Sequence, residues 1–85
     1  DINNNSYGMY ADNNSTADIS GNNIHDNSGF GMYVDNWSTV DISSNHIHNN
    51  NDYGIFLDKS VGDISGNDIH NNNIQMQIGH PHFLV

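Results

Sequence analysis

The sequence has no cysteine, arginine or glutamate, and it contains only one lysine, Lys59, and one proline, Pro81. Without cysteine, neither disulfide bonds nor thiol chemistry are available to this chain. Ten aspartates against one lysine give a formal net charge of −9, whereas binding a phosphate backbone requires lysine and arginine. We therefore expect no nucleic-acid partner, and the same charge disfavours anionic membrane surfaces.

Long apolar runs are missing as well. No stretch of 18 apolar residues is present, so we expect no membrane insertion. Hydrophobic residues make up only 34% of the 85 residues, which is little for a conventional core and leaves a disordered, Asn-rich chain as the alternative. An acidic, lysine-poor and highly polar composition suits an extracellular or cell-surface protein, and we expect that location.

The sequence does have an internal repeat of 22–23 residues. Three tandem copies cover residues 8–30, 31–53 and 54–75, and partial copies at 1–7 and 76–85 flank them. A repeat of this length is typical of a solenoid, in which each copy is one coil that buries its apolar face against its neighbours. The regular register argues against disorder and predicts about 3.7 coils in one open-ended segment.

Each copy contains three short runs in which apolar and polar residues alternate. In the second copy these runs are residues 32–34, 40–42 and 46–48. A period of two over so few residues predicts strands rather than helices, and the Asn, Asp, Ser and Gly residues between the runs predict turns. We therefore predict an all-β fold with three parallel sheets, in which successive coils stack roughly 4.8 Å apart.

The alternation also assigns residues to the interior. The predicted core residues are Met9, Ala11, Met32, Val34, Ile55 and Leu57 in the first sheet, Ala17, Ile19, Val40, Ile42 and Ile64 in the second, and Ile24, Ile47 and Ile69 in the third. Tyr7, Phe30 and Tyr53 share the parity of the first set. We therefore predict that these three rings form an aromatic stack inside the coil, at a corner.

Asparagine accounts for 17 of the 85 residues and recurs at fixed positions. One aligned set is Asn22, Asn45 and Asn67, and a second is Asn4, Asn27, Asn50 and Asn72. At coil corners such side chains can hydrogen-bond to the coils above and below, as in cross-β structures, and they tolerate left-handed turns. We predict that these residues form asparagine ladders that also continue across a junction between stacked copies.

The pattern of Ile, two residues and Asn at the turns, followed by Gly-Met-Tyr-Val at 31–34 or Gly-Ile-Phe-Leu at 54–57, resembles the right-handed parallel β-helix repeat family. This family includes pectate-lyase-like enzymes, alginate C5-epimerases and lyases, phage tailspikes and many cell-surface proteins. The resemblance implies a right-handed, three-sheet parallel β-helix. It leaves the function open, because function on this fold resides in sites grafted onto it.

Tyr10, Tyr33 and Phe56 form a predicted outward column, and Trp37 lies in the turn after Tyr33. Exposed aromatic side chains beside Asp and Asn suit stacking on sugar rings, so these four residues are candidate carbohydrate-binding residues. The alternative is a cross-strand aromatic stack that protects the sheet.

A second outward column consists of His25, His48 and His70, with His46 adjacent. Imidazole is a good ligand for Zn²⁺ or Cu²⁺. However, we expect side chains stacked on parallel strands to point in parallel rather than to converge, and we identify no carboxylate to complete a tetrahedral set. We therefore assign no metal ligand and no cofactor.

Two columns of aspartate are also predicted, namely Asp12, Asp35 and Asp58, and Asp18, Asp41 and Asp63. Stacked carboxylates repel one another unless a cation lies between them, so weak Ca²⁺ binding is one interpretation. The alternative is that the carboxylates are solvated or bonded to aligned Ser and Asn side chains such as Ser15, Ser38 and Ser60.

Four asparagines stand in Asn-x-Ser/Thr sequons and are candidate glycosylation sites: Asn4, Asn13, Asn14 and Asn36. In so Asn-rich a chain, sequons also arise by chance.

No catalytic residue can be assigned. The segment His80-Pro81-His82 resembles half of the Asp-Pro-His-Asp active-site motif of alginate epimerases, but Gly79 and Phe83 occupy the positions of the two aspartates. A repeating surface suits repeated binding better than one asymmetric active site, so a non-enzymatic role is favoured. Our first hypothesis is a structural extracellular unit that stacks head to tail with copies of itself into a filament, surface layer or stalk. The alternative is part of a carbohydrate-binding or polysaccharide-processing β-helix, lyase-like or epimerase-like, with a polysaccharide as partner.

Overall fold

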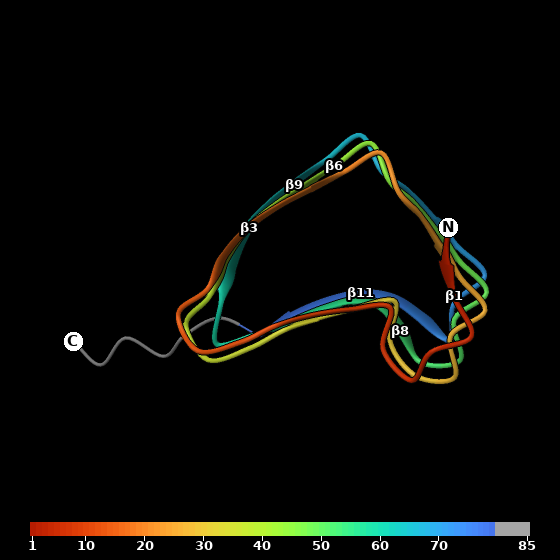
Figure 1. The fold of residues 1–85 in the computed structure, drawn as a ribbon, viewed down its shortest axis with the longest axis horizontal. Helices are drawn as coiled ribbons and strands as arrows, with labels where there is room; N and C mark the ends of the chain where they lie inside the picture. The colour runs from red at the N-terminus through yellow and green to blue at the C-terminus, as the bar shows by residue number, and fades with distance from the viewer. Residues whose placement is uncertain (80–85) are drawn as a thin grey trace.

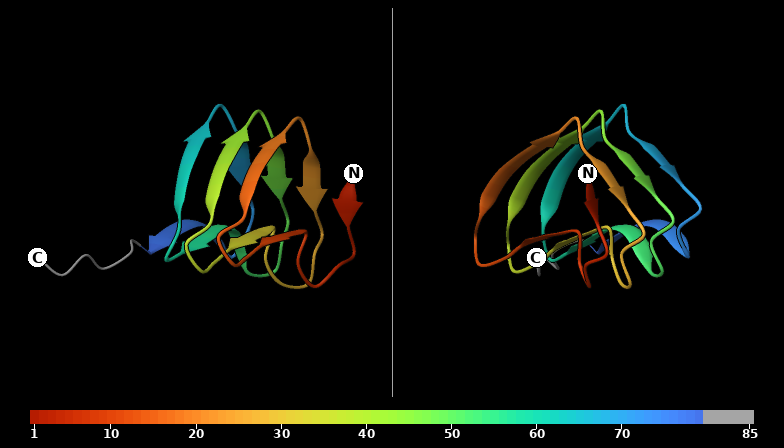
Figure 2. Two further views of the ribbon diagram at one scale, coloured as in Figure 1. Left: turned by 60° about the vertical axis from the view of Figure 1, so that its left-hand side comes forward. Right: turned by 45° about the vertical axis from the view of Figure 1, so that its right-hand side comes forward.

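The computed structural model describes residues 1–79, which wind into a coil of about four turns with strands on three sides. Viewed down the coil, successive turns lie over one another (Figure 1), and from the side they stand next to one another (Figure 2). All strands pair in parallel, and no helix is present in the described residues. The predicted all-β, three-sheet parallel solenoid is confirmed.

Within residues 1–79, eleven strands make up the three sheets, which we name A, B and C. Sheet A consists of β1 (Ile2–Asn3), β4 (Asn23–His25), β7 (His46–His48) and β10 (Asp68–His70). Sheet B consists of β2 (Met9–Ala11), β5 (Met32–Val34), β8 (Tyr53–Asp58) and β11 (Ile74–Gly79). Sheet C consists of β3 (Thr16–Ser20), β6 (Thr39–Ser43) and β9 (Val61–Ser65).

The register places equivalent residues of successive coils directly beside each other. Ile24 pairs with Ile47 and Ile47 with Ile69 in sheet A, and Asp18, Asp41 and Asp63 align in sheet C. The fourth coil begins as predicted, because Met76 pairs with Ile55.

The interior contains the predicted residues. The fully buried core consists of Ile19, Ile24, Met32, Val34, Val40, Ile42, Ile47, Ile55 and Leu57. The other predicted core residues, Met9, Ala11, Ala17, Ile64 and Ile69, are partly buried and pack against it. Aliphatic side chains from the three sheets therefore fill the interior of the coil, with no aromatic ring at its centre.

Tyr7, Phe30 and Tyr53 form the predicted aromatic column, with neighbouring ring centroids 5.3 and 5.4 Å apart, but the predicted location inside the coil is wrong. Tyr7 is exposed and Phe30 and Tyr53 are only half-buried, and the three rings lie on the outer side, packed against Tyr33 and its neighbours in the outward column. The cause lies at the glycine that follows each ring: Gly8 and Gly31 form bends directly before β2 and β5, whereas the equivalent Gly54 is the second residue of β8. A Cβ on Gly31 would lie 2.5 Å from the carbonyl oxygen of Gly54 and 2.9 Å from the Ile47 side chain, so this position faces inward. Two successive inward positions reverse the alternation, which moves the ring before the glycine outward.

Both asparagine ladders are confirmed. In one, the Asn50 side-chain carbonyl accepts hydrogen bonds from the backbone N–H and the side-chain amide of Asn27, at 3.2 and 2.8 Å. Asn50 in turn donates to Asn72 over 3.0 and 2.8 Å. The set Asn22, Asn45 and Asn67 repeats this arrangement. The pattern satisfies buried amides at two corners and links the coils.

The first coil joins the second ladder one residue later than predicted. The backbone N–H of Asn5, and not that of Asn4, donates to the Asn27 side chain at 3.0 Å, because Ile2 pairs with Ile24.

A serine ladder lines the turn between sheets B and C. The Ser38 and Ser60 side chains are buried, and their hydroxyl oxygens accept hydrogen bonds from the backbone N–H groups of Ser15 and Ser38 in the preceding coils, at 3.2 and 3.1 Å. The Ser38 hydroxyl itself donates to the main-chain carbonyl of Asp35 at 2.9 Å. The aligned serines therefore bond to the backbone rather than to aspartate carboxylates.

Candidate binding surfaces

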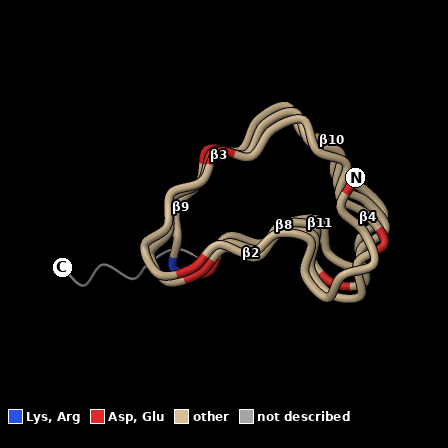
Figure 3. Tube along the Cα trace, in the orientation of Figure 1, with Lys and Arg blue, Asp and Glu red and all other residues tan. Residues whose placement is uncertain are grey.

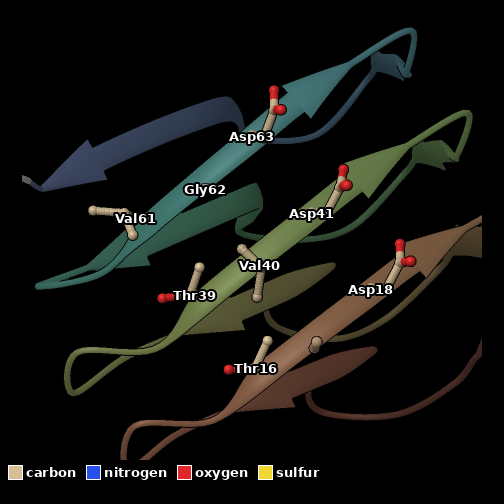
Figure 4. Close-up of a pocket in the computed structure, with 9 residues that line it drawn as sticks. Thr16, Asp18, Thr39, Val40, Asp41, Val61, Gly62 and Asp63 are labelled. Atoms are coloured by element: carbon tan, nitrogen blue, oxygen red, sulfur yellow. The ribbon is translucent and has the colours of Figure 1, made fainter.

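A groove of about 650 Å³ runs across the outer face of sheet C. Its exposed side chains come from two rows, each continuous from coil to coil: Thr16, Thr39 and Val61 in one, and Asp18, Asp41 and Asp63 in the other. The backbone at Ala17, Val40 and Gly62 forms the strip between the rows. Figure 4 shows the three carboxylates projecting in the same direction from neighbouring strands. The groove thus offers aligned acceptors beside methyl groups.

The carboxylates of the groove have no cationic partner within residues 1–79, since the ion pairs found there involve other aspartates. Figure 3 shows that the acidic residues gather in columns and that the one lysine lies away from the groove column, beside another acidic group. Unpaired, solvent-facing carboxylates are free to accept hydrogen bonds from a ligand. The groove therefore favours ligands that donate hydrogen bonds and disfavours anions.

The other acidic column, at Asp12, Asp35 and Asp58, serves the turns after the strands of sheet B. The Asp12 and Asp35 carboxylates accept hydrogen bonds from the backbone N–H of the following asparagine, at 2.8 and 2.7 Å. The Asn36 side-chain amide also donates to Asp12 at 2.6 Å. Local donors thus account for two members of this column, and Ca²⁺ binding remains an untested prediction.

Six aromatic side chains form one continuous surface on the outer side of sheet B. Tyr7, Phe30 and Tyr53 pack against Tyr10, Tyr33 and Phe56, with ring centroids 4.8–5.7 Å apart. Within the outward column, Tyr33 and Phe56 are stacked with only 16° between their planes. Rings that stack face to face cover the faces that a sugar would need, so this geometry favours aromatic packing between coils over sugar stacking.

Trp37 is separate from these ring pairs. It is 52% exposed and lies in the turn after β5 with a φ of 66°. Tyr10 is 57% exposed, and its hydroxyl donates to Asp12 over 3.4 Å. These two rings are therefore the most accessible of the four candidate carbohydrate-binding residues.

Burial raises the pKa of the Tyr33 hydroxyl above its ordinary value, and the carboxylates of Asp35 and Asp58 raise it further. Both effects disfavour the phenolate, which would add a negative charge beside an acidic column.

The histidines form a continuous imidazole array on the outer face of sheet A. His25, His48 and His70 stack with ring centroids 5.1 and 5.3 Å apart and nearly parallel planes, as predicted. His46 changes the geometry, because its ring lies 4.1 Å from that of His48. One ring nitrogen from each of His46, His48 and His70 lies within 4.8 Å of the other two. The imidazoles therefore come together more closely than parallel stacking alone implies.

Residues 1–80 match a family model described as a right-handed beta helix region. The chain belongs to the right-handed β-helix family. Neither a curated protein nor a solved structure matches the sequence. The family accounts for the coil, the parallel sheets and the ladders, whereas the surfaces described above are properties of this particular β-helix.

The sequons of this β-helix all lie at turns in which the asparagine adopts a left-handed conformation. Asn4, Asn13, Asn14 and Asn36 have φ values of 54–60°. The Asn36 amide is engaged with Asp12, whereas Asn13 and Asn14 are exposed. The turns thus provide a structural reason for these asparagines, and glycosylation at the four sites remains a prediction.

Two features of the surface were not predicted from the sequence. The groove on sheet C was missed, although the outward parity of Thr16 and Thr39 was visible in the repeat. The proximity of Asp68 to the histidines was also missed, although its position opposite His46 follows from the register. The motif at residues 80–82 lies outside the described residues. Within residues 1–79, no helix is long and apolar enough to cross a membrane.

Proposed function

We propose that this β-helix is a non-catalytic binding module for an extended, neutral carbohydrate chain, which lies in the groove of sheet C and crosses successive coils. The observation that carries the proposal is the pair of aligned rows in the groove, carboxylates on one side and Thr16, Thr39 and Val61 on the other. A repeating surface matches a polymer whose own units repeat, because each coil can make the same contacts with the next unit.

The chemistry of the groove supports a sugar as the ligand. Carboxylates accept strong, charge-assisted hydrogen bonds from hydroxyl groups, and the methyl groups of the opposite row can pack on the apolar C–H faces of a sugar ring. A volume of about 650 Å³ is in the range of ligand sites, which combine apolar lining with a few polar groups. The charge of −9 disfavours uronate or sulfated polymers. The same acidic, polar surface suits an extracellular location.

A panel of soluble neutral oligosaccharides and a polyuronate, titrated into the protein by calorimetry, tests the proposal. We expect binding of at least one neutral chain, little binding of the polyuronate, and a loss of affinity on Asp41→Ala because Asp41 is the central acceptor of the row. Asp52→Asn removes one negative charge outside the groove and is the matched control. Failure of every neutral glycan to bind, or equal losses in both variants, would contradict the proposal.

A second candidate is head-to-tail assembly of copies into a filament, surface layer or stalk. It is supported by the register, because the asparagine and serine ladders repeat the same hydrogen bonds from coil to coil. A non-closing head-to-tail contact generates a fibre. Electron microscopy of the purified chain distinguishes the candidates, since uniform filaments at neutral pH are expected only from assembly and monodisperse particles would exclude it.

A further inference from the structure

A two-by-two array of side chains occupies the outer face of sheet A, on β7 and β10. His46 and His48 are two residues apart on one strand and therefore project from the same face. Asp68 pairs with His46 and His70 pairs with His48 in the next coil. The Asp68 carboxylate lies 3.6 Å from His46 Nε2 and 3.0 Å from His70 Nδ1. Three imidazoles and one carboxylate thus occupy the four corners of one patch.

One nitrogen in this array makes no hydrogen bond, although the Asp68 carboxylate lies 3.6 Å away. His46 Nε2 is buried and has no hydrogen bond among the described residues, although the His46 side chain as a whole is 44% exposed. A buried ring nitrogen that makes no hydrogen bond costs free energy, and a bound ion is one of the explanations for such a group in a folded protein. The imidazoles of His48 and His70 are the nearest rings, with centroids 4.1 and 5.0 Å from that of His46.

The other two histidines already have outer partners that orient them. His48 Nε2–H donates to the Asn23 side-chain carbonyl at 2.9 Å, which leaves Nδ1 with its lone pair. His70 Nδ1–H donates to Asp68 Oδ1 at 3.0 Å, which leaves Nε2 with its lone pair. Metal-binding histidines characteristically donate their second N–H to a carboxylate or carbonyl, which sets the tautomer and the ring orientation. Both partners are in place here.

We propose that His46, His48 and His70 bind a divalent transition-metal ion of the class that prefers imidazole, such as Zn²⁺, with Asn23 and Asp68 as orienting residues. The ligands are His46 Nε2, His48 Nδ1 and His70 Nε2. This site lies on sheet A and is independent of the carbohydrate groove on sheet C. It also gives a role to His46 Nε2, because the nitrogen that makes no hydrogen bond becomes a ligand.

The array needs only a small rearrangement to bind the ion. Tetrahedral Zn²⁺ with Zn–N bonds of 2.0–2.1 Å places its ligand nitrogens about 3.4 Å apart, and one ring nitrogen from each of the three histidines already lies within 4.8 Å of the other two. Rotation of the His46 and His70 side chains, which are 44% and 42% exposed, can close that difference.

Calorimetric titration of the full chain with Zn²⁺ at pH 7 tests the proposal, with thermal unfolding as a second readout. We expect one ion per chain, and a rise in the unfolding temperature with Zn²⁺ concentration because the ion binds only the folded coil. His46→Asn should abolish this binding. The replacement is conservative for the fold, since Asn23 stands at the equivalent position on β4 and pairs with His46. Asp68→Asn should weaken binding roughly 10- to 100-fold, as expected for an orienting residue.

Two controls locate the site. His25→Asn changes a histidine outside the group of three and should leave the affinity within about twofold. A double variant, His80→Ala with His82→Ala, should also bind as the parent does, which separates the array from the other histidines of the sequence. The proposal is overturned if the parent chain binds no Zn²⁺, if folded His46→Asn binds as tightly as the parent, or if the double variant alone loses binding.

Discussion

The side-chain amide of Gln75 takes the place of an asparagine at the end of the second ladder. Its Oε1 accepts hydrogen bonds from the backbone N–H and the side-chain amide of Asn72, at 3.3 and 3.1 Å, where the preceding coils use an asparagine of the next coil. Gln75 also donates to the main-chain carbonyl of Asn72 at 3.1 Å. It follows Ile74, which pairs with Tyr53, so it stands beside Gly54 of the coil before. The glutamine therefore acts as a cap on this ladder.

Replacing this cap provides the first prediction. Gln75→Ala should lower the free energy of unfolding by about 1 kcal/mol, because the Asn72 amide loses its acceptor at a partly buried site. Urea denaturation followed by circular dichroism measures the change, and Gln77→Ala on the same strand is the matched control. Equal stability of the two variants would show that the cap contributes nothing.

The cap also bears on head-to-tail assembly. In earlier coils a glycine occupies this position because a Cβ would collide with the next coil, as at Gly54, where the nearest backbone oxygen would be 2.6 Å away. A further coil stacked in the same geometry would therefore have to displace Gln75. If copies assemble through this end, Gln75→Gly should increase the sedimentation coefficient at a given concentration. An unchanged value for this variant would count against assembly through this end.

The buried ladders predict a large and local effect. Asn50→Ala removes the acceptor for two donors of Asn27 and the donor to Asn72. We expect a loss of about 3 kcal/mol in the free energy of unfolding, because each buried polar group left unpaired costs about 1–3 kcal/mol. Asn51→Ala, at an exposed neighbour, should change stability by less than about 0.5 kcal/mol. Comparable losses in both variants would mean that the ladder hydrogen bonds of Asn50 do not contribute to the free energy of unfolding.

Alanine substitutions at two glycines distinguish the effect of packing on stability from the effect of backbone conformation. Gly31→Ala places a methyl group against the coil above, so we expect a loss of about 3 kcal/mol from overpacking. Gly21 has a φ of 69° and open space around it, so Gly21→Ala should cost only about 1 kcal/mol of left-handed strain. Chemical denaturation gives both values. The reverse order would refute the bend that we assign to Gly31.

The sequence predicted the strands and the core well because a period of two within a repeat is a strong signal. It failed where one residue interrupts that period. The bend at Gly31 reverses the parity, so Phe30 lies outside the coil although the alternation placed it inside. The position of His46 beside His48 was visible, but the distance between their rings depends on rotamers that no pattern encodes. The groove likewise depends on the shape of sheet C.

Tyr33 predicts how stability changes at alkaline pH. Its folded-state pKa is raised above the ordinary value of 10.0, so the unfolded chain ionises first. The stability linked to Tyr33 is fully present below pH 10 and is lost as the pH rises through the folded-state pKa. Tyr33→Phe should keep more of its stability between pH 10 and the folded-state pKa than the parent does, because Phe56 shows that this column accepts phenylalanine. Urea midpoints that fall equally in both proteins would contradict this assignment.

The location of a bound carbohydrate tests the proposed function most directly. Backbone amide shifts in heteronuclear NMR spectra, recorded during titration with a neutral oligosaccharide, report which face of the coil is occupied. The account predicts the largest shifts at Thr16, Thr39, Asp41 and Val61 on sheet C, with those at His46 and Tyr33 nearly unchanged. Shifts confined to the aromatic surface of sheet B, or no shifts with any neutral chain, would contradict the account.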